Sequence, residues 1–335
     1  MRLTQPYLLF LGDVTERPYA KTAFGLSDWA PDLCVGEVAL PAATVSAGLP
    51  VLTPAAAFER GARALVIGVA IRGGRIQADW MPVMIEALHA GLDVISGMHS
   101  RLGDYPELKQ AAERYGRRLF DVREPPKDLP VGTGRKRSGK RLLTVGTDCS
   151  LGKKYTALSL TRALHQLKVD ATFRATGQTG IMIAGEGIPI DAVVADFIAG
   201  AAETLSPDAE ANHWDIVEGQ GSIFHPSYSG VSLGLLHGTQ PDVIVVCHEV
   251  GRNRVYGSEQ FATPKLQETI DLHLTLARRT NPRVRCAGVA LNTLSLSEER
   301  ARETLRSYSS ILGLPVADPL RPGPEFEALT AACLG

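Results

Sequence analysis

The residues best suited to chemistry form a glycine-rich segment near the middle of the chain. An apolar run at 141–145 leads into it, and a run with helical spacing, 153–167, follows. In such a strand–loop–helix, successive backbone N–H groups form a concave nest, the helix N-terminus adds positive potential and a lysine adds a full charge. This order favours a phosphate-binding loop over an ordinary turn with incidental glycines. The loop residues are Gly146, Thr147, Asp148, Cys149, Ser150, Leu151, Gly152 and Lys153.

Two departures from the common phosphate-loop pattern bear on its chemistry. Five residues separate Gly146 from Gly152, where the usual motif has about four. Lys154 stands where Ser or Thr normally supplies the hydroxyl that binds Mg²⁺. A protonated lysine cannot ligate a metal, and Thr156, two residues on, points to a different side of the helix. We therefore expect a loop that binds phosphate without metal-assisted phosphoryl transfer, and a reaction that requires no metal.

A candidate proton acceptor lies at the end of a second apolar run, 214–218. Glu218 ends this run and is followed by glycines, so its carboxylate is the first choice for a general base, and a turn-capping carboxylate is the alternative. His225 in the next loop and Asp148 in the phosphate loop are the backup bases, although a histidine in such a loop is more often structural. Cys149 is a conceivable acylated nucleophile, but nothing in the sequence pairs it with a base.

Cationic and amide side chains follow other apolar runs and are candidates for holding a substrate. Arg174 closes the run 169–174, and Gln178 and Thr179 lie between glycines just beyond it. Arg252 and Arg254 are spaced by one residue after another strand end, so they can clamp a carboxylate. The alternative for the segment from Arg174 to Thr179 is an ordinary turn, and the alternative for the segment with Arg252 and Arg254 is a solvated surface loop.

The order of apolar and amphipathic runs predicts an α/β protein with two parallel sheets. No G-x-G-x-x-G follows the first strand, so a dinucleotide role for the first half is unsupported. The stretch 122–140 is rich in Pro, Gly, Lys and Arg and marks the best boundary. We predict a Rossmann-like domain at 1–125, a linker at 126–140 and a phosphate-loop domain at 141–335. The basic run at 135–141 is expected to be solvated, and a surface that helps attract an anionic ligand is the alternative. The predicted strands are 7–11, 33–38, 64–69, 92–96, 141–145, 169–174, 215–218, 243–247 and 287–291, and the predicted helices are 80–90, 153–167, 190–203, 231–237 and 297–312.

Composition narrows the class of protein further. The chain has 335 residues, of which 44% are hydrophobic and 21% charged, with a formal net charge of −1. No global field therefore favours nucleic acid or an anionic membrane. The five cysteines contain no CxxC pair, as expected for reduced thiols in a cytoplasmic protein. We find no signal peptide and no apolar run of membrane-spanning length.

Together these segments resemble one bacterial and archaeal family. The matching pieces are G-T-D-C-S-L-G-K-K-Y-T, which includes Tyr155 and Thr156, T-G-Q-T-G-I-M-I-A-G, V-E-G-Q-G-S, H-P-S-Y-S-G-V-S-L-G-L-L-H-G and A-L-N-T. The resemblance implies an N-terminal Rossmann-like domain, a C-terminal P-loop domain and D-glutamate N-acetyltransferase activity with acetyl-CoA as donor. The loop spacing, the Glu218 segment and Asn292 also resemble dethiobiotin synthetase and its relatives, in which they imply contacts to a nucleotide.

The resemblance and the loop chemistry agree at Lys154, because coenzyme A carries phosphates but undergoes no phosphoryl transfer. The leading hypothesis is an N-acetyltransferase of amino-acid catabolism that acts on a small acidic amino acid. An Mg-ATP-dependent ligase or kinase resembling dethiobiotin synthetase is the alternative, and a non-catalytic nucleotide sensor is a third. By analogy with other P-loop proteins of this class, we expect a homo-oligomer.

Overall fold

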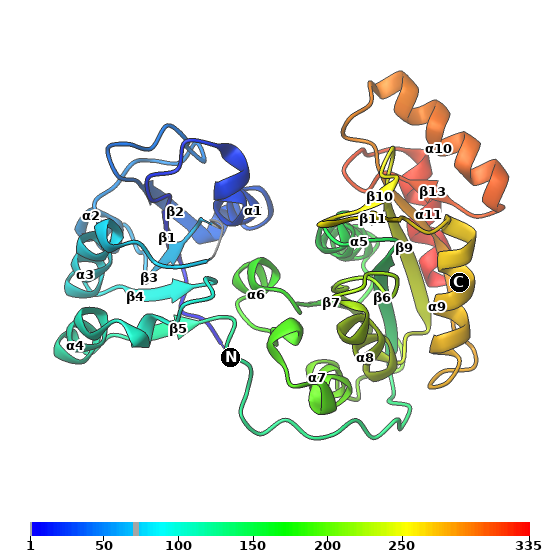
Figure 1. Ribbon diagram of the computed structural model, residues 1–335, viewed down its shortest axis with the longest axis horizontal. Coiled ribbons are helices and arrows are strands. Elements are labelled where there is room, and N and C mark those ends of the chain that lie inside the picture. The colour runs from blue at the N-terminus through cyan, green and yellow to red at the C-terminus, as the bar shows by residue number, and fades with distance from the viewer. Residues whose placement is uncertain (1, 70–73) are drawn as a thin grey trace. The chain divides into compact units, whose positions relative to one another are not determined.

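The computed structural model describes residues 2–69 and 74–335. The chain forms two compact units, drawn in Figure 1. Unit 1 contains Met1–Pro126 together with Gln178–Ala192, and unit 2 contains Lys127–Gly177 and Val193–Gly335. A segment from the second half of the sequence thus belongs to the first unit, an arrangement that boundaries at 125 and 141 do not describe.

Unit 1 is a parallel sheet with helices on both faces, and its strand order is β2-β1-β3-β4-β5. Helices α2, α3 and α4 lie along one face, and α1 packs with α6 (Figure 1). The strands are β1 (Tyr7–Phe10), β2 (Cys34–Val38), β3 (Ala64–Ile67), β4 (Asp93–Ser96) and β5 (Leu119–Asp121). The helices are α1 (Lys21–Trp29), α2 (Pro54–Glu59), α3 (Met81–His89), α4 (Pro106–Tyr115) and α6 (Gln178–Ala184).

Unit 2 is a second parallel sheet, with strand order β13-β12-β9-β6-β8-β7. Its strands are β6 (Lys140–Gly146), β7 (Ala171–Arg174), β8 (Trp214–Val217), β9 (Val243–Glu249), β12 (Arg285–Asn292) and β13 (Val316–Ala317), and an antiparallel hairpin joins β10 (Arg254–Val255) to β11 (Ser258–Ala262). Its helices are α5 (Lys153–Gln166), α7 (Ile198–Leu205), α8 (Ser229–Thr239), α9 (Leu266–Ala277), α10 (Glu298–Leu312) and α11 (Pro324–Leu334). The carboxyl ends of β8, β6 and β9 lie next to one another, so the loops that leave them meet at one edge.

The core of unit 2 explains why α5 holds its place under the phosphate loop. Its buried apolar side chains, among them Leu160 and Leu164, pack with strand residues such as Leu142 and Ile216 and with Leu329 of α11. Burying each such side chain contributes roughly 1.5–3 kcal/mol. The start of α5 is thereby fixed at the end of β6.

The expected α/β architecture with two parallel sheets is confirmed. The helix predicted at 190–203 is partly wrong, because the α-helix begins only at Ile198 and short 3₁₀ turns precede it. The chain passes from unit 1 to unit 2 between Ala192 and Val193, so one continuous helix cannot cover this stretch. No helix in the described ranges combines the length and the apolar character needed to cross a bilayer.

The prediction that the basic run is solvated is also wrong for two of its arginines. Arg137 is 5% exposed and donates through Nη2 to the carbonyl of Gly238 at 2.6 Å. Arg141 is fully buried and donates to Ser206 Oγ at 2.7 Å and to the carbonyl of Pro207 at 2.7 Å. The sequence could not show this, because the carbonyls that receive these guanidinium groups are distant along the chain. This stretch is therefore packed within unit 2.

Helices α7 and α8 approach so closely that a glycine is required at their contact. A Cβ at Gly238 would lie 2.2 Å from the carbonyl oxygen of Ala199, whereas a Cβ at Gly230, in the same helix, would meet nothing within 4 Å. Alanine substitutions at these two positions therefore distinguish the effect of packing, at Gly238, from the effect of helix propensity, at Gly230.

We predict that Gly238→Ala lowers the free energy of unfolding by about 1–3 kcal/mol, because the backbone oxygen at the contact cannot move aside without disturbing α7. Gly230→Ala, the matched control, should be neutral or stabilise by up to about 1 kcal/mol through helix propensity. Denaturant unfolding followed by circular dichroism measures both values. Equal effects would mean that the α7–α8 contact relaxes easily.

Candidate functional site

The phosphate loop joins β6 to α5 with the backbone geometry of an anion-binding nest. Ser150 has a φ of 55° and Gly152 a φ of 103°, so left-handed residues interrupt the loop just before α5 begins. A Cβ at Gly152 would meet nothing within 4 Å, so glycine is favoured there by backbone conformation rather than by space. Alternating backbone handedness of this kind turns successive N–H groups toward one anion.

Lys153 is enclosed by the loop that it follows. Its side chain is 6% exposed, and Nζ donates to the carbonyl of Asp148 at 2.7 Å. Burial lowers the pKa of Lys153, while the nearby carboxylates of Asp148 and Glu218 oppose that shift. The lysine is therefore positioned beneath the nest, where an incoming phosphate can replace the carbonyl as its partner.

Asp148 acts as the internal anchor of the loop. It is fully buried; Oδ1 accepts from the N–H of Cys149 at 2.7 Å, and Oδ2 accepts from the N–H of Tyr256 at 2.8 Å. Arg252 adds an ion pair to Oδ2 at 3.3 Å. Both oxygens are thus occupied by donors, which fits a residue that fixes the loop and argues against the backup role as a base.

Glu218 follows β8 and lies beside the phosphate-loop lysine. It is 4% exposed, and Oε2 accepts from the N–H groups of Thr176 and Gly177, each at 3.0 Å. The next residue, Gly219, cannot carry a side chain, because a Cβ there would lie 1.7 Å from the carbonyl oxygen of Thr144 and 3.1 Å from Cδ of Lys153. Two main-chain donors therefore fix the orientation of the carboxylate next to the loop.

His225 has the bonding pattern of a structural histidine. The N–H of Ser227 donates to Nδ1 at 3.1 Å, which leaves the proton on Nε2 to bond the carbonyl of Tyr256 at 3.1 Å. The ring of Tyr228 stacks on the imidazole with centroids 4.4 Å apart. Because its one lone pair is already used, this ring is a weaker candidate for a base than the sequence suggested.

One atom each from His225, Cys149 and Asp148 lies within 4.8 Å of the other two. Three such residues can hold a metal in principle, but Arg252 already neutralises Asp148 and the histidine lone pair accepts an N–H. Burial also raises the pKa of the Cys149 thiol, although Lys153 and Arg252 partly oppose it. The cluster therefore fits a divalent metal poorly, and its cysteine rests as a thiol rather than as a thiolate nucleophile.

Two of the arginines predicted to hold a substrate are paired inside unit 2. Arg252 pairs with Glu249 as well as with Asp148. Arg174 donates through Nε to Oδ1 of the buried Asp215 at 2.6 Å. Arg254, by contrast, is exposed on β10. Sequence spacing could not reveal the internal partners, because Asp148 and Asp215 are distant along the chain.

The remaining predicted residues are distributed over both units. Gln178 and Thr179 open α6 in unit 1, where Gln178 Oε1 accepts from Arg123 at 3.2 Å. Asn292 ends β12 in unit 2, and its Oδ1 accepts from the N–H of Leu294 at 3.0 Å. Asn292 therefore lies at the same sheet edge as the phosphate loop.

His248 is a site residue that the sequence reasoning missed. It lies in β9, one residue beyond the partner of Gly146 in the strand pairing, and is half-buried. Its Nδ1 lies 2.8 Å from Oγ1 of Thr147. Burial lowers the pKa of His248, so the ring is neutral near pH 7. The sequence does place a histidine at the end of an apolar strand. In that segment, however, the two arginines that follow it, Arg252 and Arg254, were the only predicted site residues.

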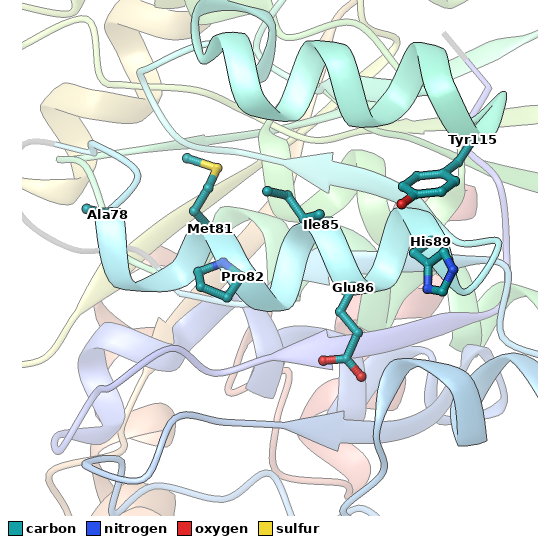
Figure 2. Close-up of a pocket in the computed structure, with 7 residues that line it drawn as sticks. All are labelled: Ala78, Met81, Pro82, Ile85, Glu86, His89 and Tyr115. Carbon is teal, nitrogen blue, oxygen red and sulfur yellow. The ribbon is translucent and has the colours of Figure 1, made fainter.

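Two hollows can be described, and neither Glu218 nor His248 lines either of them. One, of about 560 Å³, is an open groove on the outer side of α3 in unit 1; Figure 2 shows Met81 and Ile85 pointing toward α4 and Glu86 pointing away from it. The other, of about 10 Å³, lies in unit 2 between β6 and residues that include Ser222, Ser232 and His273. It has room for about one water.

Comparison with known proteins now adds to this geometry. Residues 130–328 match the P-loop domain of the DUF1611 family, a domain of unknown function, and residues 34–125 match its N-terminal Rossmann-like domain. The chain belongs to this family. Its P-loop and Rossmann-like parts correspond to the two architectures expected from the sequence.

Similar DUF1611 proteins extend over nearly the whole chain. A D-glutamate N-acetyltransferase from a Pseudoalteromonas species is 47% identical over 323 residues, 96% of this chain and 97% of that protein. One from Tritonibacter scottomollicae is 48% identical over 318 residues, 95% of this chain and 96% of that protein. A crystal structure of a DUF1611 protein from Anabaena variabilis superposes with a TM-score of 0.87 at 33% identity and covers 99% of both chains. On the strength of the two D-glutamate N-acetyltransferases, the present protein is an enzyme of the acyltransferase class.

The internal pairing of Arg252 predicts its mutational effect. Arg252→Met should lower the free energy of unfolding by about 3 kcal/mol, because it leaves the carboxylate of Asp148 buried without its cation. Arg254→Met, which changes an exposed arginine two residues away, should alter it by less than about 0.5 kcal/mol.

Denaturant unfolding provides the stability values, and steady-state kinetics provides KM for the acceptor. A fully stable Arg252→Met protein with a raised acceptor KM would reverse the interpretation and make Arg252 a substrate ligand.

Proposed function

We propose that this enzyme transfers the acetyl group of acetyl-CoA to the amino group of an acidic amino acid, D-glutamate, in amino-acid catabolism. The observation that supports it most is the Glu218 carboxylate held beside Lys153 of the phosphate loop. A proton acceptor next to a phosphate cradle is what transfer from a phosphate-bearing thioester to an amine requires. The names of the two curated relatives support both the reaction and the amino acid.

The donor would bind through its phosphates at the carboxyl edge of the unit 2 sheet. Backbone N–H groups of the loop and the N-terminus of α5 would hold the phosphates, with Lys153 as their charged partner. Lys154, Tyr155 and Thr156 continue α5 from there, and Asn292 at the same edge would lie toward the adenine. Lys154 replaces the usual magnesium ligand, so we propose that the reaction needs no metal.

Glu218 would act as the general base. The acceptor amine is protonated near neutral pH and cannot attack the thioester until it loses a proton. The N–H groups of Thr176 and Gly177 both donate to Oε2 and so fix the orientation of the carboxylate next to the loop. The Ser222 hydroxyl would stabilise the tetrahedral oxyanion. Within unit 2, the exposed Arg254 is the remaining proposed contact for the acceptor.

Thiol release tests the reaction as a whole. The protein is incubated with acetyl-CoA and, in turn, D-glutamate, L-glutamate, D-aspartate and D-glutamine, and free coenzyme A is followed with a thiol reagent while mass spectrometry identifies the product. We expect release that depends on the acceptor, is fastest with D-glutamate and persists in EDTA. Release without any acceptor, or turnover that requires Mg-ATP, would contradict the proposal.

Replacing the base tests the assignment of Glu218. Glu218→Gln keeps the shape and can still hydrogen-bond but cannot accept a proton from an ammonium. We expect kcat to fall on the order of 100- to 10,000-fold, with acetyl-CoA affinity by calorimetry within a few fold of wild type. A variant that keeps more than about a tenth of wild-type kcat would show that another group is the base.

A further inference from the structure

The reaction proposed above moves two protons, and one carboxylate accounts for only the first. The ammonium of the acceptor carries three protons and the amide product carries one. The first must leave before the nitrogen attacks the thioester carbon. The second leaves the nitrogen in the tetrahedral intermediate, whose collapse breaks the C–S bond and releases a thiolate. That thiolate becomes coenzyme A thiol when it receives a proton, so a second group that accepts and then returns a proton assists this step.

The strand order places a suitable group on the other side of the phosphate loop. Strand β6 lies between β8 and β9, so the loop that leaves β6 has the end of β8 on one flank and the end of β9 on the other. Glu218 follows β8, and His248 lies near the end of β9. The loop is thus flanked by a carboxylate and an imidazole.

The contacts of His248 suit a group that exchanges protons. Its Nδ1 lies 2.8 Å from Oγ1 of Thr147, which is fully buried within the loop. When Nδ1–H donates to this hydroxyl, the lone pair is on Nε2. The ring is half-buried rather than enclosed. A histidine whose one nitrogen is fixed by a hydrogen bond presents the other nitrogen in a defined direction.

The groups around His248 keep it neutral at rest. Burial lowers its pKa below the ordinary value of 6.5, and the cation of Arg252 acts in the same direction, while the carboxylate of Glu249 opposes both. Leu291, its partner in the pairing of β9 with β12, adds no charge. A neutral imidazole can accept the second proton from nitrogen, and the imidazolium so formed can return it to sulfur.

Resting on the proposed acetyl transfer, we propose that His248 is a second proton-transfer residue, which carries a proton from the attacking nitrogen to the departing thiolate on the side of the phosphate loop opposite Glu218. His225, the histidine favoured by sequence, has both ring nitrogens committed to main-chain groups and does not fill this role. His248 and Glu218 thus divide the two proton movements between the two flanks of the loop.

Two substitutions test this assignment. His248→Asn keeps an amide that can bond Oγ1 of Thr147 but removes the titratable ring. His248→Ala leaves a gap that added imidazole can enter. His237→Asn serves as the control, because His237 is a half-buried histidine of α8 that bonds the carbonyl of Leu276. For each folded variant, kcat is measured with acetyl-CoA and the preferred acceptor, and acetyl-CoA affinity is measured by calorimetry.

We expect kcat of His248→Asn to fall on the order of 100-fold with acetyl-CoA affinity within a few fold of wild type. Imidazole should restore activity to His248→Ala at pH values where imidazole is neutral, and His237→Asn should behave like wild type. A His248→Asn enzyme that keeps more than about a third of wild-type kcat, or a His248→Ala enzyme that imidazole does not rescue, would overturn the assignment. Either result in an active wild-type enzyme leaves the acetyl transfer intact, whereas an inactive wild type would refute the proposed function itself.

Discussion

The need to satisfy buried charge around the phosphate loop governs the arrangement of unit 2. Asp148, Lys153 and Glu218 are all nearly or fully buried, and an isolated ion in such a place costs several kcal/mol. Each is therefore given a main-chain partner: N–H groups for the two carboxylates and a carbonyl for the lysine. The segments that supply these partners must fold into place for the loop to exist. This is why short loops distant in the sequence converge on one sheet edge.

The hairpin of β10 and β11 illustrates this constraint. The N–H of Tyr256 bonds Asp148, and its carbonyl accepts from His225, so one exposed residue joins two loops through its backbone alone. Arg252 precedes the hairpin and completes the partners of Asp148. Arg252 thus stabilises the conformation of the loop, which accounts for one arginine of the pair that resembles a substrate clamp in the sequence.

The parts of this site that follow from local chemistry could be predicted, and those that depend on distant partners could not. The strand, the nest and the lysine are contiguous, so the sequence alone could predict the loop. Glu218 was proposed as a site residue because an acid after an apolar strand lies at the ligand-binding edge of a parallel sheet. The same reasoning failed for Arg174 and Arg137, whose partners lie about 40 and 100 residues away in the chain. His248 was missed because its contact is with Thr147, in the loop that follows the neighbouring strand β6, and not with a residue of its own segment.

Lys154 connects the electrostatics of the loop to the kind of reaction that it can support. In P-loop enzymes that transfer phosphoryl groups, Mg²⁺ neutralises charge that develops on the phosphates during the reaction. A thioester donor develops its negative charge on the carbonyl oxygen and the sulfur and not on its phosphates, so those phosphates need only be held. Lys154 follows Lys153 directly, and its ammonium lies 4.4 Å from the ring centroid of Tyr155. The ammonium of Lys154 can bind a phosphate, but it cannot ligate the Mg²⁺ that would act as the Lewis acid in phosphoryl transfer. The loop is therefore chemically suited to holding the phosphates of a donor that undergoes no phosphoryl transfer.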